Sequence, residues 1–387
     1  MTDPARDGSA PAGPAAYADL DAASSQPLHP AAREVFLAAL DQGYADPRRL
    51  HHGARTARLL LDNAREAVAE SLGVRTPEVT FTSSGTDAVH RGLLGLLRGR
   101  ERAGRTLVHS AVEHSAVLHA AAWAQVPTVA VPVTATGLVT TTAVTEALAA
   151  VDGDAGVLAV QSANHEVGTV QPVGEIAATT DVPLFVDACA SAGRLPLPAG
   201  WAVAAASAHK WGGPAGVGLL LVRTGARWRN ALPGDDRVDE RSSGFENVPA
   251  ALAAAAALQA VVAEREERSA REHRLVDRVR RAVGALADVE VVGEPEHRLP
   301  HLVTFSCLYV DGEALVHELD RRGCGIASGS ACTASTLEPS HVLVAMGALT
   351  HGNVRLSVGR DTTDADVTRF LTALPEVVAT LRGRVGL

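Results

Sequence analysis

Lys210 is the side chain in this sequence best suited to covalent chemistry. It is the only lysine among 387 residues, and arginine carries the positive charge elsewhere in the chain. Because arginine supplies positive charge everywhere else, the single lysine indicates a site that needs an amine rather than a charge. Burial or a nearby charge lets such an amine form a Schiff base with an aldehyde. We therefore predict that Lys210 anchors pyridoxal phosphate, the alternative being a surface lysine in a turn.

Three other segments could hold a phosphate and a flat ring. Ser84-Gly85-Thr86 lies between a predicted strand and a predicted helix, where backbone N–H groups bind phosphate, although the triplet could simply cap the helix. Asp187 ends an apolar strand 23 residues before Lys210, so its carboxylate could pair with a protonated pyridine nitrogen. His114 opens a predicted helix and could stack on the ring and move protons, or face solvent.

Two further residues could act on a substrate. Arg355 lies in an alternating, strand-like run, where its guanidinium could hold a carboxylate or face solvent. Cys332 lies in a run of small and polar residues, 327–336, which cannot form a core and is predicted to be an exposed loop. Because an exposed thiol oxidises, this run indicates a nucleophile that moves to a substrate. Cys189 and Cys307 have apolar neighbours and are interpreted as buried packing residues.

Composition limits the class of protein. Hydrophobic residues make up 47% of the chain and aromatic residues 3%, so alanine and valine must fill much of the interior. A formal net charge of −9 without a long basic run argues against nucleic acid or an anionic membrane surface as partner. The four cysteines lack metal-ligand spacing, and neither a signal peptide nor a membrane-spanning apolar run is present. We expect a soluble, cytoplasmic protein.

Short apolar strands and helical patterns alternate along most of the chain. Residues 1–17 are rich in Ala, Pro, Gly and Asp and are predicted to be a disordered tail. The alternation over 18–265 is typical of a mainly parallel sheet covered on both faces. One long helix over 250–285 leads into a smaller α/β unit, 266–387. Strands are expected near 79–82, 106–109, 128–131, 157–160, 183–187, 203–206, 216–222, 289–292, 302–306 and 353–358.

Eight stretches, taken in order, resemble the cysteine desulfurases, a branch of the class V aminotransferases. They are LDAASSQP, FTSSGTDAV, VEHSAVL, NHEVGTVQPV, FVDACASAGRLP, SAHKWGGPAGVG, SGSACTASTLEPSHVLVAMG and VRLSVGR. The run SGSACTAS followed by EPSHVL is the most specific, because it is similar to the group whose catalytic cysteine lies on a flexible loop. The resemblance implies an α/β fold of fold type I, with a large cofactor domain, a mainly parallel sheet and a smaller α/β C-terminal domain.

The resemblance also implies a role for each residue singled out above. Lys210 would be the Schiff-base lysine, Asp187 the partner of the pyridine nitrogen and His114 the residue stacked on the ring. The phosphate would be held by Gly85, Thr86, Ser207 and His209. Arg355 would bind the substrate carboxylate, and Cys332 would take the sulfur of L-cysteine as a persulfide, releasing alanine. A sulfur-acceptor protein would receive that sulfur, and the enzyme would be a homodimer.

Three positions depart from the family pattern. His165 stands where the family has an asparagine that contacts the ring hydroxyl of the cofactor, so His165 is the expected contact. Asn164 precedes it and is not expected to substitute, because adjacent strand residues face opposite ways. Ala190 replaces a glutamine, and Phe245 replaces a threonine that reaches the phosphate from a neighbouring subunit. These changes leave open an enzyme for selenocysteine or another amino acid, or a weakly catalytic scaffold or partner subunit.

Overall fold

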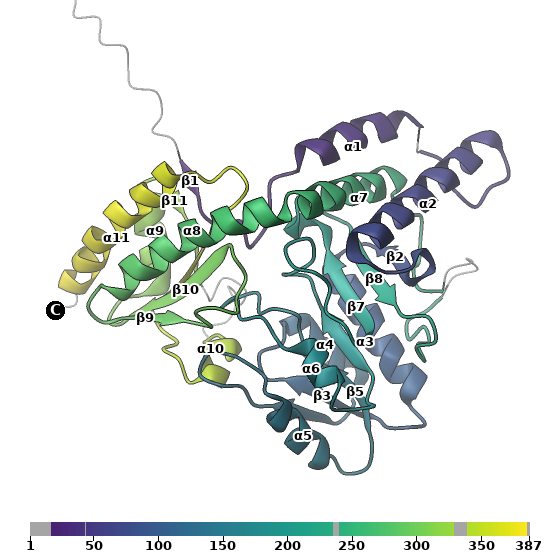
Figure 1. Ribbon diagram of the computed structural model, residues 1–387, viewed down its shortest axis with the longest axis horizontal. Helices are drawn as coiled ribbons and strands as arrows, with labels where there is room; N and C mark the ends of the chain where they lie inside the picture. Colours follow the sequence, from purple (N-terminus) through teal and green to yellow (C-terminus); the bar gives the residue numbers. More distant parts are fainter. Residues whose placement is uncertain (1–16, 43, 235–239, 329–338, 385–387) are drawn as a thin grey trace, which may run out of the picture.

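The computed structural model of the chain describes residues 17–42, 44–234, 240–328 and 339–384. Most of the predicted tail, and the predicted nucleophile Cys332, lie outside these ranges. The described residues form a large sheet, a small sheet and the helices that cover them, with α7 and α8 running from one part to the other (Figure 1).

The large sheet has seven strands in the order β2-β8-β7-β6-β5-β3-β4. They are β2 (Val79–Thr82), β3 (Thr106–Ser110), β4 (Thr128–Val131), β5 (Ala155–Ala159), β6 (Leu184–Asp187), β7 (Trp201–Ser207) and β8 (Gly218–Val222). Only β8 runs antiparallel to its neighbours. The predicted α/β fold with a mainly parallel sheet is thus confirmed.

Helices cover both faces of this sheet, which explains why its strands are apolar throughout. One face packs against α3 (Gly85–Arg100) and α4 (Ser115–Ala124). The other packs against α2 (His52–Leu72), α5 (Thr141–Ala149), α6 (Val173–Ala177) and α7 (Val248–Ala263), and α1 (Pro30–Gln42) lies on α7. Successive residues of β6 alternate between the two cores, with Phe185 facing α3 and both Leu184 and Val186 facing away from it.

The small sheet is antiparallel, in the order β12-β13-β10-β9. Its strands are β9 (Val289–Val292), β10 (Leu302–Cys307), β12 (Ala327–Ser328) and β13 (Asn353–Ser357). Helices α8 (Arg265–Gly284), α9 (Gly312–Asp320) and α11 (Asp364–Arg384) share its core. The short helix α10 (His341–Met346) packs between the two parts, against Val112, Val167 and Val292 of β9.

The N-terminal end of the described chain belongs with the small sheet. Strand β1 (Ala18–Asp19) pairs with β11 (Cys324–Gly325), and Leu20 is buried in the same core. Tyr17 donates a hydrogen bond to Asp320 at 2.7 Å. Tyr17 was predicted to belong to the tail, and Ala18 was predicted to belong to the large unit. In the structure both contact the small unit. This segment is held in place by apolar residues that lie far from it in the sequence.

The predicted single helix over 250–285 is wrong in one respect, because it consists of two helices. Helices α7 and α8 meet at Glu264 and are bent by 72°. Helix α7 packs on α1 and α2, whereas α8 packs on β9, β10 and α11, so the bend follows two different surfaces. No single described helix is long and apolar enough to cross a membrane, and only this bent pair together has the length and composition.

A buried ion cluster supports the backbone around Lys210. Glu272 accepts hydrogen bonds from Arg268 at 2.6 Å and from Arg194 at 3.3 Å, and all three side chains are buried. The guanidinium of Arg194 also reaches the carbonyl of Lys210 at 3.5 Å. Burial lowers the pKa of Arg194 to about 10, which still leaves it charged at neutral pH. Glu272 therefore compensates two buried cations.

Replacing Glu272 with alanine should cost about 3–5 kcal/mol of unfolding free energy, because two guanidinium groups would stay buried without a counter-charge. Urea unfolding monitored by tryptophan fluorescence measures this cost. Glu101→Ala is the control, since Glu101 and Arg229 form an exposed pair at 3.6 Å that is worth at most about 1 kcal/mol. Equal losses in the two variants would contradict the role given to Glu272.

Candidate active site

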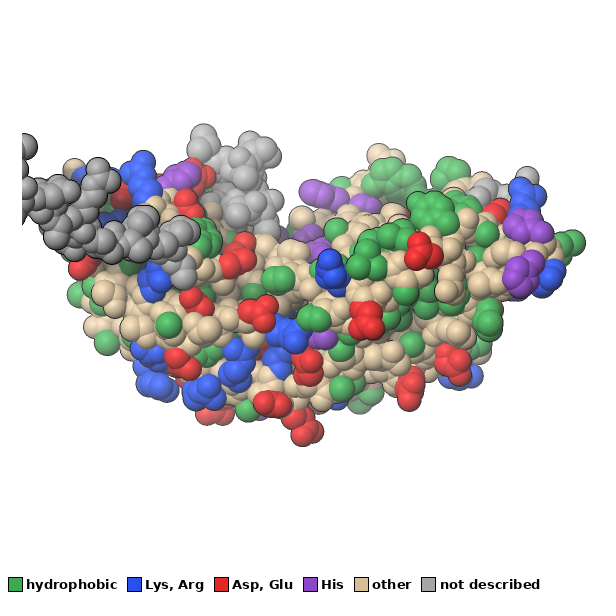
Figure 2. Space-filling model, turned by 90° about the horizontal axis from the view of Figure 1, so that it is seen from above, with side chains coloured by type: hydrophobic (Ala, Val, Ile, Leu, Met, Phe, Trp, Pro, Cys, Tyr) green, Lys and Arg blue, Asp and Glu red, His purple; other side chains and the backbone are tan. Residues whose placement is uncertain are grey.

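One cavity collects the residues that the sequence singled out. It lies at the carboxyl ends of strands of the large sheet, where α/β folds bind ligands, and has a volume of about 240 Å³. Its walls are formed by Ser24, Gly85, Thr86, Val89, His114, Ala116, Gln161, Ala163, His165, Asp187, Cys189, Ala190, Ser207, His209, Lys210 and Arg355. The surface dips between the two parts of the molecule, with histidine side chains in the dip (Figure 2).

Lys210 enters the cavity from the short 3-10 helix that follows β7. Its Nζ atom donates a hydrogen bond to the carbonyl of Ala23 at 2.6 Å, so the N-terminal segment orients the amine. Three residues earlier in the chain, Ser207 ends β7, and its hydroxyl lies 3.1 Å from Nδ1 of His209. The structure thus places Lys210, Ser207 and His209 together, as the sequence predicted.

The N-terminus of α3 forms a phosphate-sized cradle beside these residues. Ser84 caps the helix through its side chain, leaving Gly85 and Thr86 to line the cavity. A Cβ atom on Gly85 would lie 2.6 Å from Cβ of Ser207 and 2.8 Å from its hydroxyl oxygen. Any side chain at position 85 would therefore fill the cradle. The open N–H groups and the helix dipole together favour an anion here.

Asp187 lies at the end of β6, and Cys189 lies beside it. The backbone N–H of Cys189 donates to Asp187 Oδ1 at 2.8 Å, and the thiol hydrogen-bonds to the same carboxylate. Burial and the charge of Asp187 raise the pKa of Cys189 well above its ordinary value. Cys189 packs against the core beside α3, as predicted, but it is only partly buried and also lines the cavity. Cys307 is fully buried, as predicted.

Two histidines form one wall of the cavity. The rings of His114 and His165 lie 4.8 Å apart, edge to face. Nδ1 of His114 accepts a hydrogen bond from the N–H of Ala116 at 3.1 Å, which places the proton of the neutral ring on Nε2. Burial lowers the pKa of both histidines, and the positive charge of Lys210 adds to this effect. Both rings are therefore neutral at pH 7, and His114 does not face solvent.

The three departures from the family pattern have separate consequences. Asn164 is committed elsewhere, because its amide donates to the carbonyl of Val112 at 3.1 Å and its oxygen accepts from two backbone N–H groups. His165 faces the cavity, and its buried Nδ1 has no hydrogen-bond partner among the described residues. Ala190 adds an apolar wall, and Phe245 is 51% exposed at the surface.

Arg355 reaches the cavity from the small sheet and is buried, which excludes the solvent-facing alternative. One Nη atom donates to the carbonyl of His165 at 3.0 Å. The other donates to Asp21 at 3.0 Å and to the hydroxyl of Ser24 at 2.8 Å. Its buried Nε has no hydrogen-bond partner within the described ranges.

The sequence did not single out Ser24, Gln161 or Glu113. Gln161 donates from its backbone N–H to Glu113 Oε1 at 2.7 Å, and Glu113 Oε2 is buried with no partner in the described chain. Burial, and then the charge of Asp187, raise the pKa of Glu113 to about 8. The motif VEHSAVL contains Glu113, but only the fold brings it close to Asp187.

The segment that contains Cys332 is joined at both ends to residues near the cavity. On one side, β12 pairs with β13 so that Ala327 lies opposite Arg355. On the other side, Ser340 donates to Glu166 and His341 contacts the carbonyl of Glu113 at 2.8 Å. Both attachment points therefore lie on the elements that carry Arg355, His165 and His114.

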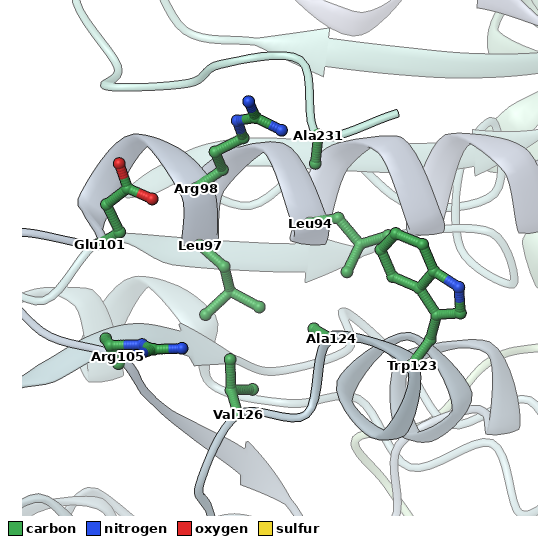
Figure 3. Close-up of a pocket in the computed structure, with 9 residues that line it drawn as sticks. All are labelled: Leu94, Leu97, Arg98, Glu101, Arg105, Trp123, Ala124, Val126 and Ala231. Carbon is green, nitrogen blue, oxygen red and sulfur yellow. The ribbon is translucent and has the colours of Figure 1, made fainter. Parts of the chain in front are cut away.

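A larger groove, of about 570 Å³, opens near the other end of α3 (Figure 3). Trp123 lies at one end of it, and Arg98 and Glu101 project from α3. None of the residues predicted to do chemistry is among its described walls. The cavity around Lys210 is therefore the candidate active site, although it is the smaller of the two.

Comparisons with known proteins agree with this geometry. A model of the aminotransferase class-V family matches residues 17–370. The chain belongs to this family. An IscS-like cysteine desulfurase of Mycobacterium tuberculosis is 37% identical over 383 residues, which cover 94% of this chain and 96% of that protein. The cysteine desulfurase IscS of Dictyoglomus turgidum is 31% identical over 373 residues, covering 94% and 95%.

Solved structures extend the agreement to the fold. A NifS-like protein superposes on this class-V chain with a TM-score of 0.85 and 27% identity, covering 94% of this chain and 100% of that chain. These comparisons confirm the resemblance to the cysteine desulfurases and the fold-type I architecture.

The residues of the cavity fit the pyridoxal phosphate that class-V enzymes use. A Cβ atom at Gly85 would clash with Ser207, so glycine lets the N-terminus of α3 lie next to the Ser207 hydroxyl in the cavity wall, where its N–H groups favour an anion. The buried, unpartnered Nδ1 of His165 is a hydrogen-bonding atom that a ring substituent could satisfy. Lys210 supplies the amine and Asp187 a carboxylate in the same cavity. The donor set therefore matches an aldehyde, a phosphate and a basic ring nitrogen.

Replacing Glu113 with glutamine should reduce the dependence of stability on pH. A carboxyl group whose pKa is raised by folding stabilises the fold below its unfolded pKa, near 4.5, and this contribution is lost as the pH rises toward about 8. Unfolding free energies from urea titrations should fall less between pH 5 and 8 in Glu113→Gln than in the wild type. The exposed Glu175→Gln serves as control, and identical slopes in all three proteins would refute the assignment.

Proposed function

We propose that this protein is a pyridoxal-phosphate-dependent L-cysteine desulfurase that stores the sulfur as a persulfide on Cys332. The observation that carries the proposal is the convergence of Lys210, Asp187 and Arg355 on one cavity. The relatives named cysteine desulfurase cover nearly the whole chain, so the proposal rests on a match of complete proteins.

Each wall of the cavity would hold one part of the cofactor. Gly85, Thr86, Ser207 and His209 would bind the phosphate, and Asp187 would keep the ring nitrogen protonated. His114 would stack on the ring, and His165 would face its hydroxyl. When bound, the cofactor withdraws electrons from the α-carbon of the amino acid attached to it.

Lys210 has two tasks in this scheme. Its amine would hold the aldehyde of the cofactor, and the same amine, when not bonded to the cofactor, would take the α-proton of the substrate. The hydrogen bond from Nζ to the carbonyl of Ala23 gives that amine a fixed resting place. Arg355 orients the substrate through its carboxylate, for which the buried Nε has a vacant hydrogen bond.

The sulfur step balances without an external oxidant. The Cys332 thiolate attacks the sulfur of the substrate, and a sulfur–sulfur bond forms as the carbon–sulfur bond breaks. The electron pair of the broken bond stays on carbon, which is protonated to give alanine. The products are alanine and one persulfide, ready for transfer to a sulfur-acceptor protein.

Covalent reach supports Cys332 as the nucleophile. Cys332 follows Ser328 by four residues, which span at most about 14 Å when extended. Ser328 pairs with Val354, next to Arg355, so this tether keeps the thiol within range of the cavity. Cys189 lines the cavity but is a poor nucleophile, since burial and Asp187 disfavour its thiolate.

A homodimer forms part of the proposal. Phe245 is half exposed and occupies the position at which family members reach the phosphate of a neighbouring subunit. A phenylalanine side chain has no hydrogen-bond donor to replace that of a threonine, so Phe245 would contribute packing to the partner's cavity.

Lys210→Ala should abolish covalent cofactor binding, because no other lysine can replace its amine. The purified wild type, supplied with pyridoxal phosphate, should show a Schiff-base absorption band and a mass increase at Lys210 after borohydride reduction. The variant should show neither. A wild type without the band would overturn the cofactor assignment.

Cys332→Ser should lose at least about 100-fold in alanine formation from L-cysteine while keeping the cofactor band, because the sulfur has no acceptor. Cys189→Ser is the matched control and should retain most of the activity. Alanine is quantified by chromatography and the persulfide by mass spectrometry. The reverse result, with only Cys189→Ser inactive, would move the nucleophile to Cys189.

His165 and Ala190 replace polar residues of the family pattern in the wall that would face the cofactor ring. This difference supports a second candidate function, in which the substrate is another amino acid. An enzyme for selenocysteine or another amino acid would turn that substrate over much faster than cysteine. Comparing kcat/KM across these amino acids decides between the two functions.

A further inference from the structure

Glu166 is a buried carboxyl group that the proposed chemistry does not use. It is 7% exposed, and its Oε2 accepts a hydrogen bond from the hydroxyl of Ser340 at 2.8 Å. Its Oε1 is buried and has no partner among the described residues. A buried carboxyl group with a single side-chain contact is costly to maintain, so the contact with Ser340 needs an explanation.

The backbone of Glu166 is fixed on two sides. Its N–H donates to the side chain of Asn164 at 2.8 Å, and its carbonyl accepts from the hydroxyl of Thr304 on β10 at 2.6 Å. Glu166 also directly follows His165, whose ring faces the cavity and whose carbonyl binds Arg355. The carboxyl group is thus held at a set position relative to the active site.

Ser340 is the residue that this carboxyl group holds. The Ser340 hydroxyl caps α10 by accepting from the N–H of Leu343 at 3.3 Å while it donates to Glu166. The next residue, His341, contacts the carbonyl of Glu113, which precedes His114. Helix α10 therefore begins attached to both loops that carry the histidines of the cavity.

We propose that Glu166 is a positioning residue for sulfur transfer, which fixes Ser340 as the attachment point of the segment that carries Cys332. The inference rests on the proposed function, since it concerns the step in which Cys332 takes the sulfur. Cys332 precedes Ser340 by eight residues, so a displaced Ser340 would displace the covalent attachment of the segment that carries the thiol.

The nature of the contact decides which replacement should be tolerated. Burial raises the pKa of Glu166 to about 7, although the hydrogen bond from Ser340 and the charge of Arg355 oppose this. The neutral acid and the carboxylate both present an oxygen to Ser340. A glutamine keeps that oxygen, whereas an alanine removes it, so Glu166→Gln should rescue what Glu166→Ala loses.

Single-turnover sulfur transfer tests the proposal in the cofactor-loaded enzyme. The protein is mixed with excess L-cysteine and quenched, and the Cys332 persulfide is quantified by mass spectrometry. Glu166→Ala and Ser340→Ala should each slow transfer about tenfold, with the half-saturating cysteine concentration changed less than about twofold. Glu166→Gln should stay within about threefold of wild type. The double variant should be no slower than either alanine variant, because both remove the same contact.

Glu294→Ala is the matched control. Glu294 accepts from the hydroxyl of Thr136 at 2.7 Å, so it also joins the two parts of the molecule through a hydroxyl–carboxyl contact, but this contact does not involve Ser340, the residue at which α10 is attached. It should transfer sulfur at nearly the wild-type rate. The absorption spectrum of the bound cofactor establishes that each variant has bound the cofactor, and thermal unfolding establishes that it is folded. If Glu166→Ala fails either check, the test is made with Ser340→Ala.

The possible failures are distinct. Wild-type transfer rates in Glu166→Ala and Ser340→Ala, or an equal loss in Glu294→Ala, would overturn the positioning role and leave the proposed function intact. A raised half-saturating cysteine concentration at an unchanged rate would also overturn it, assigning Glu166 to substrate binding through Arg355. A wild type that forms no persulfide on Cys332 would refute the proposed function, and this inference with it.

Discussion

The cavity depends on one buried arginine that joins the two sheets. Arg355 belongs to β13, yet its guanidinium binds the carbonyl of His165 and the side chains of Asp21 and Ser24, of which Asp21 lies 334 residues away in the sequence. These oxygens replace water around the charge, so the guanidinium is held in place and remains compensated. The same N-terminal segment accepts the hydrogen bond of Lys210 through Ala23. The amine of Lys210 and the guanidinium of Arg355 are thereby both tied to the N-terminal segment.

Burial then determines which groups near Lys210 carry charge. Burial lowers the pKa values of His114 and His165, which favours their neutral rings. It raises the pKa values of Cys189 and Glu113, which favours the thiol and the neutral acid. In surroundings of low polarity the remaining charges interact more strongly than they would in water. The arrangement leaves the nucleophilic sulfur to be supplied from outside this rigid wall, which is consistent with a thiol on a separate segment.

Local sequence patterns were sufficient to predict site residues that stand at the beginning or end of a helix or strand. Gly85 begins a helix, Asp187 ends a strand and Lys210 follows another, and the carboxyl ends of these strands meet at one edge of the sheet. The patterns failed where a neighbour came from far along the chain. Glu113 directly precedes His114 in the sequence, but the fold brings it close to Asp187, whose charge helps to raise the pKa of Glu113. The sequence did not predict the break at Glu264, because helical periodicity contains no information on which surface α7 and α8 will each pack against.

The sequence by itself determined the α/β fold, the single amine and the family, because these rest on residue type, short-range periodicity and contiguous motifs. Only the tertiary structure decided that Arg355 faces the cavity, that Asn164 is committed to its own loop and that Glu166 holds Ser340. The physical reason is that burial, hydrogen-bond partners and pKa all depend on groups brought together from distant parts of the chain. No local pattern of residues contains that information.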